Sequence, residues 1–245
     1  MQKNNILVAI PTYNEKDNVP LMYNKIKELQ LPIDILFVDD NSPDGTGAVI
    51  NKLIEQDATV HAVHRPKKMG LGAAHKQAFS FATKHGYAYL ITMDADLTHD
   101  PKYIPDLLAL KNESDIVIGS RYADGGSMHG WHKFRLPFTY FWRSMIKNGL
   151  GLPYDSTGAY RLYNTKILKP EVYDQVKDGF AFCMESLYRF AQHGARIIET
   201  PIQAHSRVHG HSKLSWLIML QVAQRFCNLT YDRFLHTVGI RNLSL

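Results

Sequence analysis

The sequence predicts an α/β protein in which helices flank a mainly parallel sheet, and two observations support that class. Short apolar runs alternate with helical patterns of about 10 to 15 residues through the first half of the chain. Continuous apolar strands between helices are typical of parallel sheets buried on both faces. The chain has 245 residues, of which 45% are hydrophobic, so it is long enough to bury a substantial core.

The expected elements follow one another with little interruption. Strands are expected at residues 6–10, 33–38, 59–63, 87–93 and 115–119, and helices at residues 19–29, 46–56, 72–85 and 101–111. Farther along, strands are expected at residues 158–162 and 196–201, with a helix at residues 182–193 between them. Polar clusters follow the first four strands, at residues 11–14, 39–44, 64–72 and 94–100. Because ligands bind beyond the carboxyl ends of such strands, the sequence predicts a site along that edge.

The segment 121–152 has an irregular pattern that is rich in glycine and aromatic residues, among them Gly125, Trp131 and Phe138. A flexible segment of this kind beside an active edge can form a lid or an acceptor surface. The alternative is a helix that packs on the sheet, and the pattern does not choose between the two.

The segment 214–236 is predicted to be a helix with one polar stripe. The stripe consists of Gln221, Gln224, Arg225, Asn228 and Asp232, and the other side carries Trp216, Met219, Leu220, Ala223, Phe226 and Phe234. Two interpretations stay open, since such a helix either docks on the domain or lies in a membrane interface. We therefore expect one domain at residues 1–213 and a helical tail, docked or membrane-interfacial, at residues 214–245.

The charge of the chain points to anionic partners. The formal net charge is +5, and the longest basic run is Arg65-Pro66-Lys67-Lys68. Since no long block of like charges occurs, we expect local phosphate sites and no nucleic acid. Two isolated cysteines indicate neither a disulfide framework nor a zinc knuckle. No signal-peptide pattern and no apolar run near the roughly 20 residues of a spanning helix occur, so we expect a cytoplasmic protein.

Asp94 and Asp96 follow the apolar run at residues 87–93 and are separated by one residue. Residues i and i+2 of a strand point to one face, so both carboxylates can turn toward one hard cation. A cation held in this way keeps positions for water and for substrate phosphates, which suits an enzyme with a phosphorylated donor. The alternative for an Asp-x-Asp pair by itself is a solvated turn.

Asp39 and Asp40 begin a loop that continues to Thr46 after the second expected strand. A carboxylate here can accept hydrogen bonds from a ribose or a base edge, although the same residues also suit a plain turn that ends in a helix cap. Neither a Gly-x-Gly-x-x-Gly loop nor a Walker-type loop follows the first strand, so neither a dinucleotide cofactor nor a P-loop is indicated. A nucleotide held without these loops, beside a metal-binding Asp pair, points to nucleotide-sugars.

Several motifs occur in a typical order, and together they resemble family 2 glycosyltransferases of the GT-A fold. They are PTYNE at residues 11–15, VDDNSPDGT at 38–46, GLG at 70–72, MDADL at 93–97 and GSRY at 119–122. The resemblance is strongest to the dolichyl- or polyprenyl-phosphate mannosyltransferase branch, through DSTGAYRL at 155–162, FAFCME at 180–185 and RVHGHSKL at 207–214. It covers residues 5 to 215 approximately, so the GT-A domain is expected to be residues 1–213.

The resemblance implies roles for individual residues. The nucleoside would be held by Pro11, Tyr13, Glu15 and Asp39 or Asp40, and Mg²⁺ or Mn²⁺ would be held across the donor diphosphate by Asp94 and Asp96. The phosphates of donor and acceptor would be bound by Arg121, Arg135, Arg207 and Lys213. Arginine offers a planar fork and lysine a point charge, and both suit phosphate.

A few positions depart from the branch or stay open. Thr98 stands where the branch often has a Gln that helps to bind the metal, and Ala159-Tyr160 replaces Gly-Phe or Ser-Phe. His99 is a candidate neighbour of the metal or the acceptor phosphate. Glu185 is either a buried functional residue or the partner of a nearby arginine. These departures leave the reaction type intact and the identities of sugar and acceptor open.

The function implied by the resemblance is metal-dependent, inverting transfer of mannose from GDP-mannose to a polyprenyl phosphate at the cytoplasmic face of a membrane. The membrane would be reached by peripheral contact or through a membrane-anchored partner subunit. The alternatives are a family 2 transferase with another nucleotide-sugar, such as UDP-glucose, or another acceptor, and a non-catalytic binding subunit. An alcohol acceptor needs a general base, and the sequence offers no convincing one, which favours a phosphate acceptor.

Overall fold

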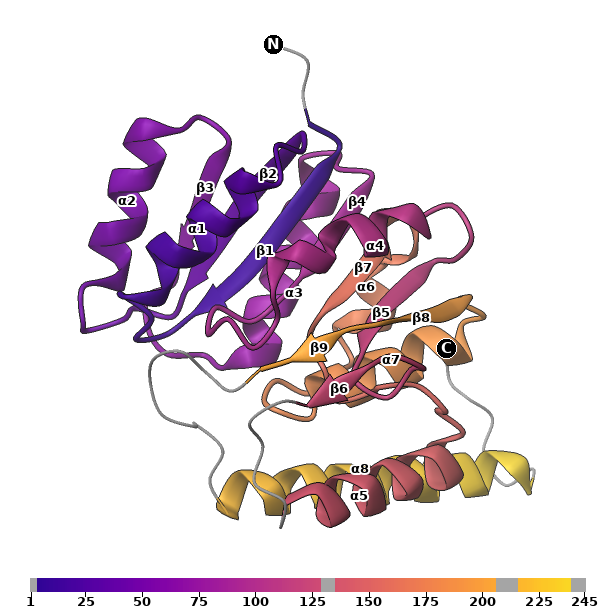
Figure 1. Ribbon diagram of the computed structural model, residues 1–245. Coiled ribbons are helices and arrows are strands. Elements are labelled where there is room, and N and C mark those ends of the chain that lie inside the picture. The colour runs from indigo at the N-terminus through magenta and orange to yellow at the C-terminus, as the bar shows by residue number, and fades with distance from the viewer. Residues whose placement is uncertain (1–3, 129–134, 206–215, 239–245) are drawn as a thin grey trace.

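The computed structural model describes residues 4–128, 135–205 and 216–238. Its centre is a seven-stranded sheet in the order β3-β2-β1-β4-β7-β5-β8, with helices on both faces (Figure 1). Strands β3, β2, β1 and β4 run parallel, as do β5 and β8, whereas β7 lies antiparallel between β4 and β5. The predicted α/β class with a mainly parallel sheet is confirmed.

The first half of the chain forms the parallel part of the sheet with its crossover helices. In chain order the elements are β1 (Ile6–Thr12), α1 (Asn18–Glu28), β2 (Ile33–Asp39), α2 (Thr46–Gln56), β3 (Val60–His64), α3 (Leu71–Lys84) and β4 (Tyr89–Thr92). These bounds lie within a few residues of the predicted ones. The agreement follows from the buried character of the strands, since β1 and β2 are buried almost throughout and therefore read as continuous apolar runs.

The second half contains shorter elements. They are η1 (Pro101–Tyr103), α4 (Ile104–Ala109), β5 (Ile116–Ser120), β6 (Ser127–Met128), α5 (Arg135–Leu150), β7 (Arg161–Asn164), η2 (Thr165–Ile167), α6 (Pro170–Tyr173), α7 (Phe182–Gln192), β8 (Ile197–Pro201), β9 (Gln203–Ala204) and α8 (Trp216–Thr237). The strand predicted at residues 158–162 begins only at Arg161, because the residues before it form a loop at the sheet edge. Strands β6 and β9 pair with each other in a separate two-stranded sheet.

Two apolar cores cover the two faces of the sheet. Alternate residues of β1 point to opposite faces, so Val8 packs with α1, α2 and α4 while Leu7 packs with α3, α6 and α7. Phe37 fills the first core and Phe79 the second, and both side chains are fully buried. Burying side chains of this size contributes about 1.5–3 kcal/mol each.

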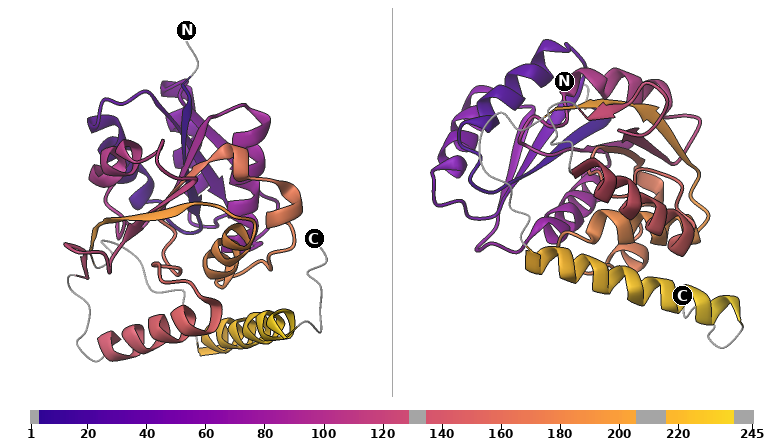
Figure 2. Two further views of the ribbon diagram at one scale, coloured as in Figure 1. Left: turned by 90° about the vertical axis from the view of Figure 1, so that its right-hand side faces the viewer. Right: turned by 60° about the horizontal axis from the view of Figure 1, so that its bottom comes forward.

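Helices α5 and α8 form a third layer, which lies below the rest of the molecule in Figure 1 and again in the first view of Figure 2. Ile146 and Leu150 of α5 pack with Phe226 and Leu229 of α8 and with residues of α7. Gly149 allows the close approach, because a Cβ there would lie 2.7 Å from the Cζ atom of Phe226. Part of the irregular segment is therefore a helix, but it packs on α8 and not on the sheet.

The predicted C-terminal helix is present, but part of its polar stripe points inward and much of its apolar side is exposed. Phe226 and Leu229 dock it on the protein, and Arg225 of the polar stripe points inward to Glu185. By contrast, Trp216, Leu220 and Phe234 of the apolar side are exposed. Among the described residues, none of the helices has the length and apolar character required to cross a membrane.

Gly72, the second residue of α3, permits the closest packing between α3 and the loop before α7. A Cβ at this position would lie 2.9 Å from the Cα of Asp178 and from the backbone N of Gly179. We expect Gly72→Ala to lower the free energy of unfolding by about 1–3 kcal/mol, because backbone atoms have to move. Urea denaturation followed by circular dichroism measures the change.

Gly47, the second residue of α2, provides the matched control. A Cβ there meets the ring of His64 at 3.4 Å and Oδ2 of Asp39 at 3.5 Å, which are ordinary van der Waals contacts with side chains. Gly47→Ala should leave stability unchanged or raise it by up to about 1 kcal/mol through helix propensity. Equal destabilisation by the two substitutions would contradict the assignment of the close contact to Gly72.

Candidate functional site

The loops that follow the parallel strands meet along the carboxyl edge of the sheet (Figure 1), as predicted. Three non-glycine residues of these loops have a left-handed backbone: Asn14, Asn41 and Leu97. Asn adopts this conformation readily, but Leu does so at a cost of the order of 1 kcal/mol or more. Leu97 lies between Asp96 and Thr98, so the backbone strain is located in the loop that is predicted to bind the metal.

Asp39 holds the loop after β2 against the end of β1. Its carboxylate accepts hydrogen bonds from the Thr12 hydroxyl at 3.2 Å, from the Ser42 hydroxyl at 2.6 Å and from the Ser42 backbone N–H at 3.1 Å. The residue is 3% exposed. Both carboxylate oxygens of Asp39 therefore accept hydrogen bonds from within the protein. These bonds hold the loop after β2 beside the end of β1, where residues are predicted to bind a nucleoside.

Asp40 fastens the loop after β3 and forms a buried ion pair with Arg65. It also accepts hydrogen bonds from the backbone N–H groups of Met69 and Gly70 at 3.2 and 3.0 Å. Burial lowers the pKa of Arg65, and the adjacent Asp40 offsets only part of that effect. The Nε and Nη1 atoms of Arg65 have no hydrogen-bond partner. The pair places a polar, charged group under the loop that leads into α3.

The residues of the loop after β1 lie at the same edge. Pro11 is the penultimate residue of β1, and the ring of Tyr13 lies 4.0 Å from the Nζ atom of Lys68. Glu15 is buried, accepts a hydrogen bond from Asn18 at 2.7 Å and donates its backbone N–H to the Thr46 hydroxyl. The structure thus brings the predicted nucleoside-binding residues of β1 and β2 together.

Asp94 and Asp96 lie just beyond the end of β4, the strand next to β1 at the middle of the sheet. Asp96 is 4% exposed, whereas the side chain of Asp94 is 36% exposed. The Thr98 hydroxyl donates to Oδ1 of Asp96 at 2.6 Å, and the Thr98 backbone N–H donates to the same oxygen at 3.1 Å. Thr98 therefore orients the Asp96 carboxylate through two hydrogen bonds.

His99 lies beside the other carboxylate and bonds to the backbone of Asp94. Its Nδ1 accepts a hydrogen bond from the backbone N–H of Asp94 at 3.2 Å and lies 3.6 Å from the Asp94 carboxylate. Its ring stacks on Tyr160 with centroids 5.3 Å apart. His99 thus fixes the backbone at Asp94, at the start of the loop that carries both carboxylates.

The donor set fits a hard divalent cation. Two carboxylates lie on one short loop; that of Asp94 is partly exposed, and that of Asp96 is oriented by the Thr98 hydroxyl. Mg²⁺ is commonly held in this way, by one or two carboxylates with waters and substrate phosphates completing the shell.

Arg121 follows β5 and is joined to Asp155 by a bidentate ion pair. Its Nε and Nη2 donate to the two carboxylate oxygens at 2.8 and 2.7 Å, and Nη2 also donates to the Thr157 hydroxyl. Burial opposes the charge of Arg121, but Asp155 raises its pKa above the usual value. In Asp155, burial acts to raise the pKa, and the attraction of Arg121 outweighs it and lowers the pKa.

Glu185 is fully buried at the start of α7 and pairs with Arg225 of α8 through Nε at 2.6 Å and through Nη2. The same carboxylate accepts a long hydrogen bond from the backbone N–H of Lys177 at 3.4 Å. Of the two interpretations of Glu185, the structure supports pairing with an arginine. This arginine lies on the C-terminal helix, so the pair joins α8 to the domain.

Three predicted phosphate-binding residues cannot be placed. Arg207 and Lys213 lie outside the described residues, as does the side chain of Arg135, whose backbone begins α5. Their roles therefore stay predictions.

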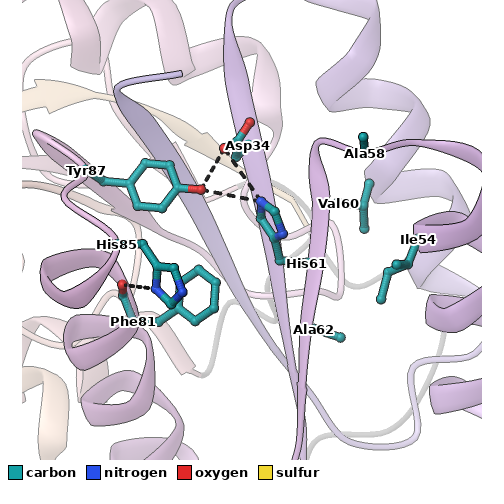
Figure 3. Close-up of a pocket in the computed structure, with 9 residues that line it drawn as sticks. All are labelled: Asp34, Ile54, Ala58, Val60, His61, Ala62, Phe81, His85 and Tyr87. Carbon is teal, nitrogen blue, oxygen red and sulfur yellow. Dashed lines mark hydrogen bonds and ion pairs between the residues drawn. The ribbon is translucent and has the colours of Figure 1, made fainter. Parts of the chain in front are cut away.

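A groove of about 570 Å³ lies away from this edge, at the start of β2 and β3 (Figure 3). Its polar side chains point toward one another: the Tyr87 hydroxyl donates to Asp34 at 2.6 Å, and the His61 ring lies 3.6 Å from the same carboxylate. Burial, with Asp34 beside it, raises the pKa of Tyr87. We read this cluster as a structural network and not as part of the candidate site.

Sequence reasoning missed the partners of the buried acidic residues. The sequence presents Arg65 only as part of a basic run, and it indicates no partner for Asp155 or Arg225. One signal was available for Arg65, since it directly follows β3 and therefore lies at the same edge as Asp40. For Asp155 and Arg225 no local signal exists, because their partners lie 34 and 40 residues away.

A mainly parallel sheet with a carboxylate pair after its central strand is the arrangement that the resemblance to GT-A glycosyltransferases predicts. The comparison with known families agrees: the model of glycosyl transferase family 2 matches residues 7–171, and the chain belongs to that family.

Two relatives cover most of this chain. An undecaprenyl-phosphate mannosyltransferase of Micrococcus luteus is 37% identical over 212 residues, covering 86% of this chain and 87% of the relative. A polyprenol monophosphomannose synthase of Mycolicibacterium smegmatis is 38% identical over 217 residues, covering 85% of this chain and 80% of the relative. The predicted family and the prediction of an enzyme are thus confirmed.

Among solved structures, the mannosyltransferase PcManGT from Pyrobaculum calidifontis, in complex with GDP-Man and Mn²⁺, has a TM-score of 0.60 at 15% identity. The match covers 95% of this chain and 64% of the archaeal chain, so this chain spans about two thirds of that protein's length. At this identity the likeness concerns the fold, and the predicted GT-A fold is confirmed.

The Arg121–Asp155 pair leads to a prediction on stability. Asp155→Asn leaves a buried guanidinium without its counter-charge, so we expect a loss of about 3–5 kcal/mol in the free energy of unfolding. Thr157→Val, which removes only an exposed partner of Arg121, should cost less than about 1 kcal/mol. Urea denaturation at pH 7 measures both.

The same pair predicts a pH dependence. Because the pKa of folded Asp155 is lowered, its contribution is fully present above the ordinary pKa of 3.8 and is lost as the pH falls through the lower folded value. The stability difference between the native protein and Asp155→Asn should therefore be the same at pH 7 and pH 5 and shrink only below about pH 4. A difference that already shrinks between pH 7 and pH 5 would refute this assignment.

Proposed function

We propose that this chain transfers mannose from GDP-mannose to a polyprenyl phosphate in a reaction that depends on Mg²⁺ or Mn²⁺. The observation that carries the proposal is the carboxylate pair Asp94 and Asp96 at the end of β4, in which the Thr98 hydroxyl orients Asp96. It occurs in a family 2 chain whose relatives at 37% and 38% identity are named as undecaprenyl-phosphate and polyprenol-phosphate mannose-transferring enzymes. The metal and the sugar donor are supported by the archaeal structure with GDP-Man and Mn²⁺.

In the proposed reaction, an oxygen of the acceptor phosphate attacks the anomeric carbon of the sugar. The bond from that carbon to the nucleoside diphosphate breaks, and the diphosphate leaves with the electron pair. A phosphate monoester has its second pKa near 6, so the attacking oxygen is already anionic at neutral pH and no general base is needed. Attack opposite the leaving group inverts the anomeric centre and gives a β-linked sugar phosphate.

The residues of the chain would serve this reaction in two groups. Around the nucleoside we place Pro11, Tyr13, Glu15, Asp39 and Asp40, and around the phosphates Arg121, Arg207 and Lys213. When bound, the divalent cation would neutralise charge on the departing diphosphate. Because Arg121 is held by Asp155, its position relative to the diphosphate would be set before the donor binds.

A lipid-linked acceptor requires that the enzyme work at a membrane surface. We place it at the cytoplasmic face, where it would act as a peripheral protein or through a membrane-anchored partner subunit.

A transfer assay tests the proposal. GDP-mannose, polyprenyl phosphate and Mg²⁺ or Mn²⁺ are incubated with the protein, alongside GDP-glucose, UDP-glucose and UDP-N-acetylglucosamine. Lipid-linked mannose that forms only with metal supports the proposal. Transfer from another donor would leave the reaction type unchanged and replace GDP-mannose as the donor. Absence of transfer from every donor would reject polyprenyl phosphate as the acceptor.

Asp96→Asn should lower the turnover number more than about 100-fold at saturating Mn²⁺, because one of the two metal-binding carboxylates is lost. Asp106→Asn removes an exposed carboxylate on α4 and should leave the rate unchanged. Steady-state kinetics at saturating donor provide the measurement. A rate for Asp96→Asn close to that of the native protein would remove Asp96 from the metal site.

Thr98→Val keeps the shape of the side chain but removes the hydroxyl that donates to Asp96. We expect the Mn²⁺ concentration for half-maximal activity to rise about tenfold or more, since supporting hydrogen bonds typically matter by 10- to 100-fold in metal affinity. Thr98→Ser retains the hydroxyl and should behave like the native protein. If the valine variant needs no more Mn²⁺ than the serine variant, the hydroxyl does not orient the metal ligand.

A further inference from the structure

Tyr160 is a fully buried tyrosine that directly precedes β7 and lies against the loop of the candidate metal site, residues 94–100. It belongs to the same apolar cluster as Ala95 and Leu97 of that loop. It is also one of the positions at which this chain departs from the branch that it resembles, since Phe is usual there. The hydroxyl is what distinguishes this residue from Phe, and inside a core a hydroxyl needs a hydrogen-bond partner.

The hydroxyl of Tyr160 fastens the end of the 94–100 loop. It donates a hydrogen bond to the backbone carbonyl of Asp100 at 3.1 Å, across 60 residues of sequence. Burial raises the pKa of Tyr160 well above its usual value, so the hydroxyl keeps its proton at neutral pH and remains a donor. The Asp100 side chain in turn accepts the backbone N–H of Lys102 at 3.1 Å and caps η1. The loop therefore ends at a fixed point.

The ring of Tyr160 supports the same loop one residue earlier. It stacks on the imidazole of His99, with centroids 5.3 Å apart and ring planes inclined by 25°. Nδ1 of His99 accepts the backbone N–H of Asp94, at the start of the loop. Tyr160 thus contacts the loop at its end and, through His99, acts on its beginning.

Two strands hold Tyr160 itself in place. The backbone N–H of Gly119 in β5 donates to the Tyr160 carbonyl at 2.9 Å, and the Thr92 hydroxyl at the end of β4 donates to the carbonyl of Ala159 at 2.6 Å. Gly119 leaves room for the ring, because a Cβ there would lie 3.1 Å from Cδ1 of Tyr160. Strand β5 continues into Arg121, so Tyr160 stands between the two parts of the candidate site.

The loop needs support of this kind, because Leu97 has a left-handed backbone with a φ of 63°. A strained conformation persists only where its surroundings fix it. Carboxylates that are already held in the binding arrangement bind a cation more tightly, since no ordering of the loop then opposes binding. Thr98 orients the Asp96 carboxylate from within the loop, and Tyr160 fixes the loop from outside.

We propose that Tyr160 is a positioning residue of the cation site, whose hydroxyl raises the affinity for Mg²⁺ or Mn²⁺ by holding the 94–100 loop at Asp100. Tyr160 touches neither the cation nor the substrates and acts through the loop. This inference rests on the proposed function for the presence of a divalent cation, and not for the sugar donor or the acceptor. Cation binding is measured without turnover, so its result is independent of the transfer assay.

The test compares Mn²⁺ binding by the native protein and by Tyr160→Phe, each in the presence of GDP. Electron paramagnetic resonance of free Mn²⁺ gives the dissociation constant, because bound Mn²⁺ contributes little to the signal of the aqueous ion. We expect the dissociation constant to be about three- to tenfold higher for the variant, since the loop loses one hydrogen bond. In the transfer assay the Mn²⁺ concentration for half-maximal activity should rise by the same factor, with the turnover number at saturating Mn²⁺ within about twofold of the native value.

The matched control is Tyr87→Phe, which makes the same chemical change at a buried tyrosine away from the candidate site. Tyr87 is 4% exposed, and its hydroxyl donates to Asp34 at 2.6 Å. This variant should lose at least as much thermal stability as Tyr160→Phe, but its dissociation constant for Mn²⁺ should change by less than about twofold. A purely structural role of Tyr160 would instead make the two variants alike in both measurements.

The possible failures are distinguishable. A native dissociation constant in Tyr160→Phe, or an equal loss of affinity in Tyr87→Phe, would overturn the role of Tyr160 and leave the proposed function intact. Absence of Mn²⁺ binding by the native protein with GDP would overturn both, because it removes the cation site itself. Circular dichroism and thermal melting confirm that each variant is folded.

Discussion

Buried carboxylates need partners, and this requirement shapes the candidate site more than any other interaction in the structure. A carboxylate removed from water is costly unless hydrogen bonds or an opposite charge compensate for it. Asp39, Asp40, Asp155 and Glu185 are each 5% exposed or less, and each has found such compensation. Each of them has at least one partner in another segment of the chain, which for Asp39 is Thr12, so each carboxylate ties two segments together.

These ties connect the edge of the sheet to its surroundings. Asp39 joins β1 to the loop after β2, and Asp40 joins that loop to the residues before α3. Asp155 holds the end of β5 through Arg121. Preorganised charge of this kind is what electrostatic catalysis needs, because polar groups that are already in place do not have to reorganise when charge develops. These ties lie on strands and loops on either side of β4, the strand that Asp94 and Asp96 follow.

The sequence predicted the sheet class, most element bounds and the edge at which the loops meet. It succeeded there because buried strands and crossover helices leave local patterns that can be read within a few residues. It failed for β7, whose first residues were placed three positions too early, and for the packing partner of α5. It also could not supply the pairs Asp40–Arg65, Arg121–Asp155 and Glu185–Arg225, since a charge pair across 25 to 40 residues leaves no periodic signal.

Helix α8 shows why one amphipathic pattern can be interpreted in two ways. A helix with a polar stripe and a wide apolar side is expected either to dock or to lie in an interface. In the structure Arg225 of the polar stripe points inward and is anchored by Glu185, and the wide apolar side is divided between a docked face at Phe226 and an exposed face at Phe234. The two interpretations are therefore compatible. Glu185 connects α8 directly to the start of α7 and, through the backbone N–H of Lys177, to the loop that packs on Gly72.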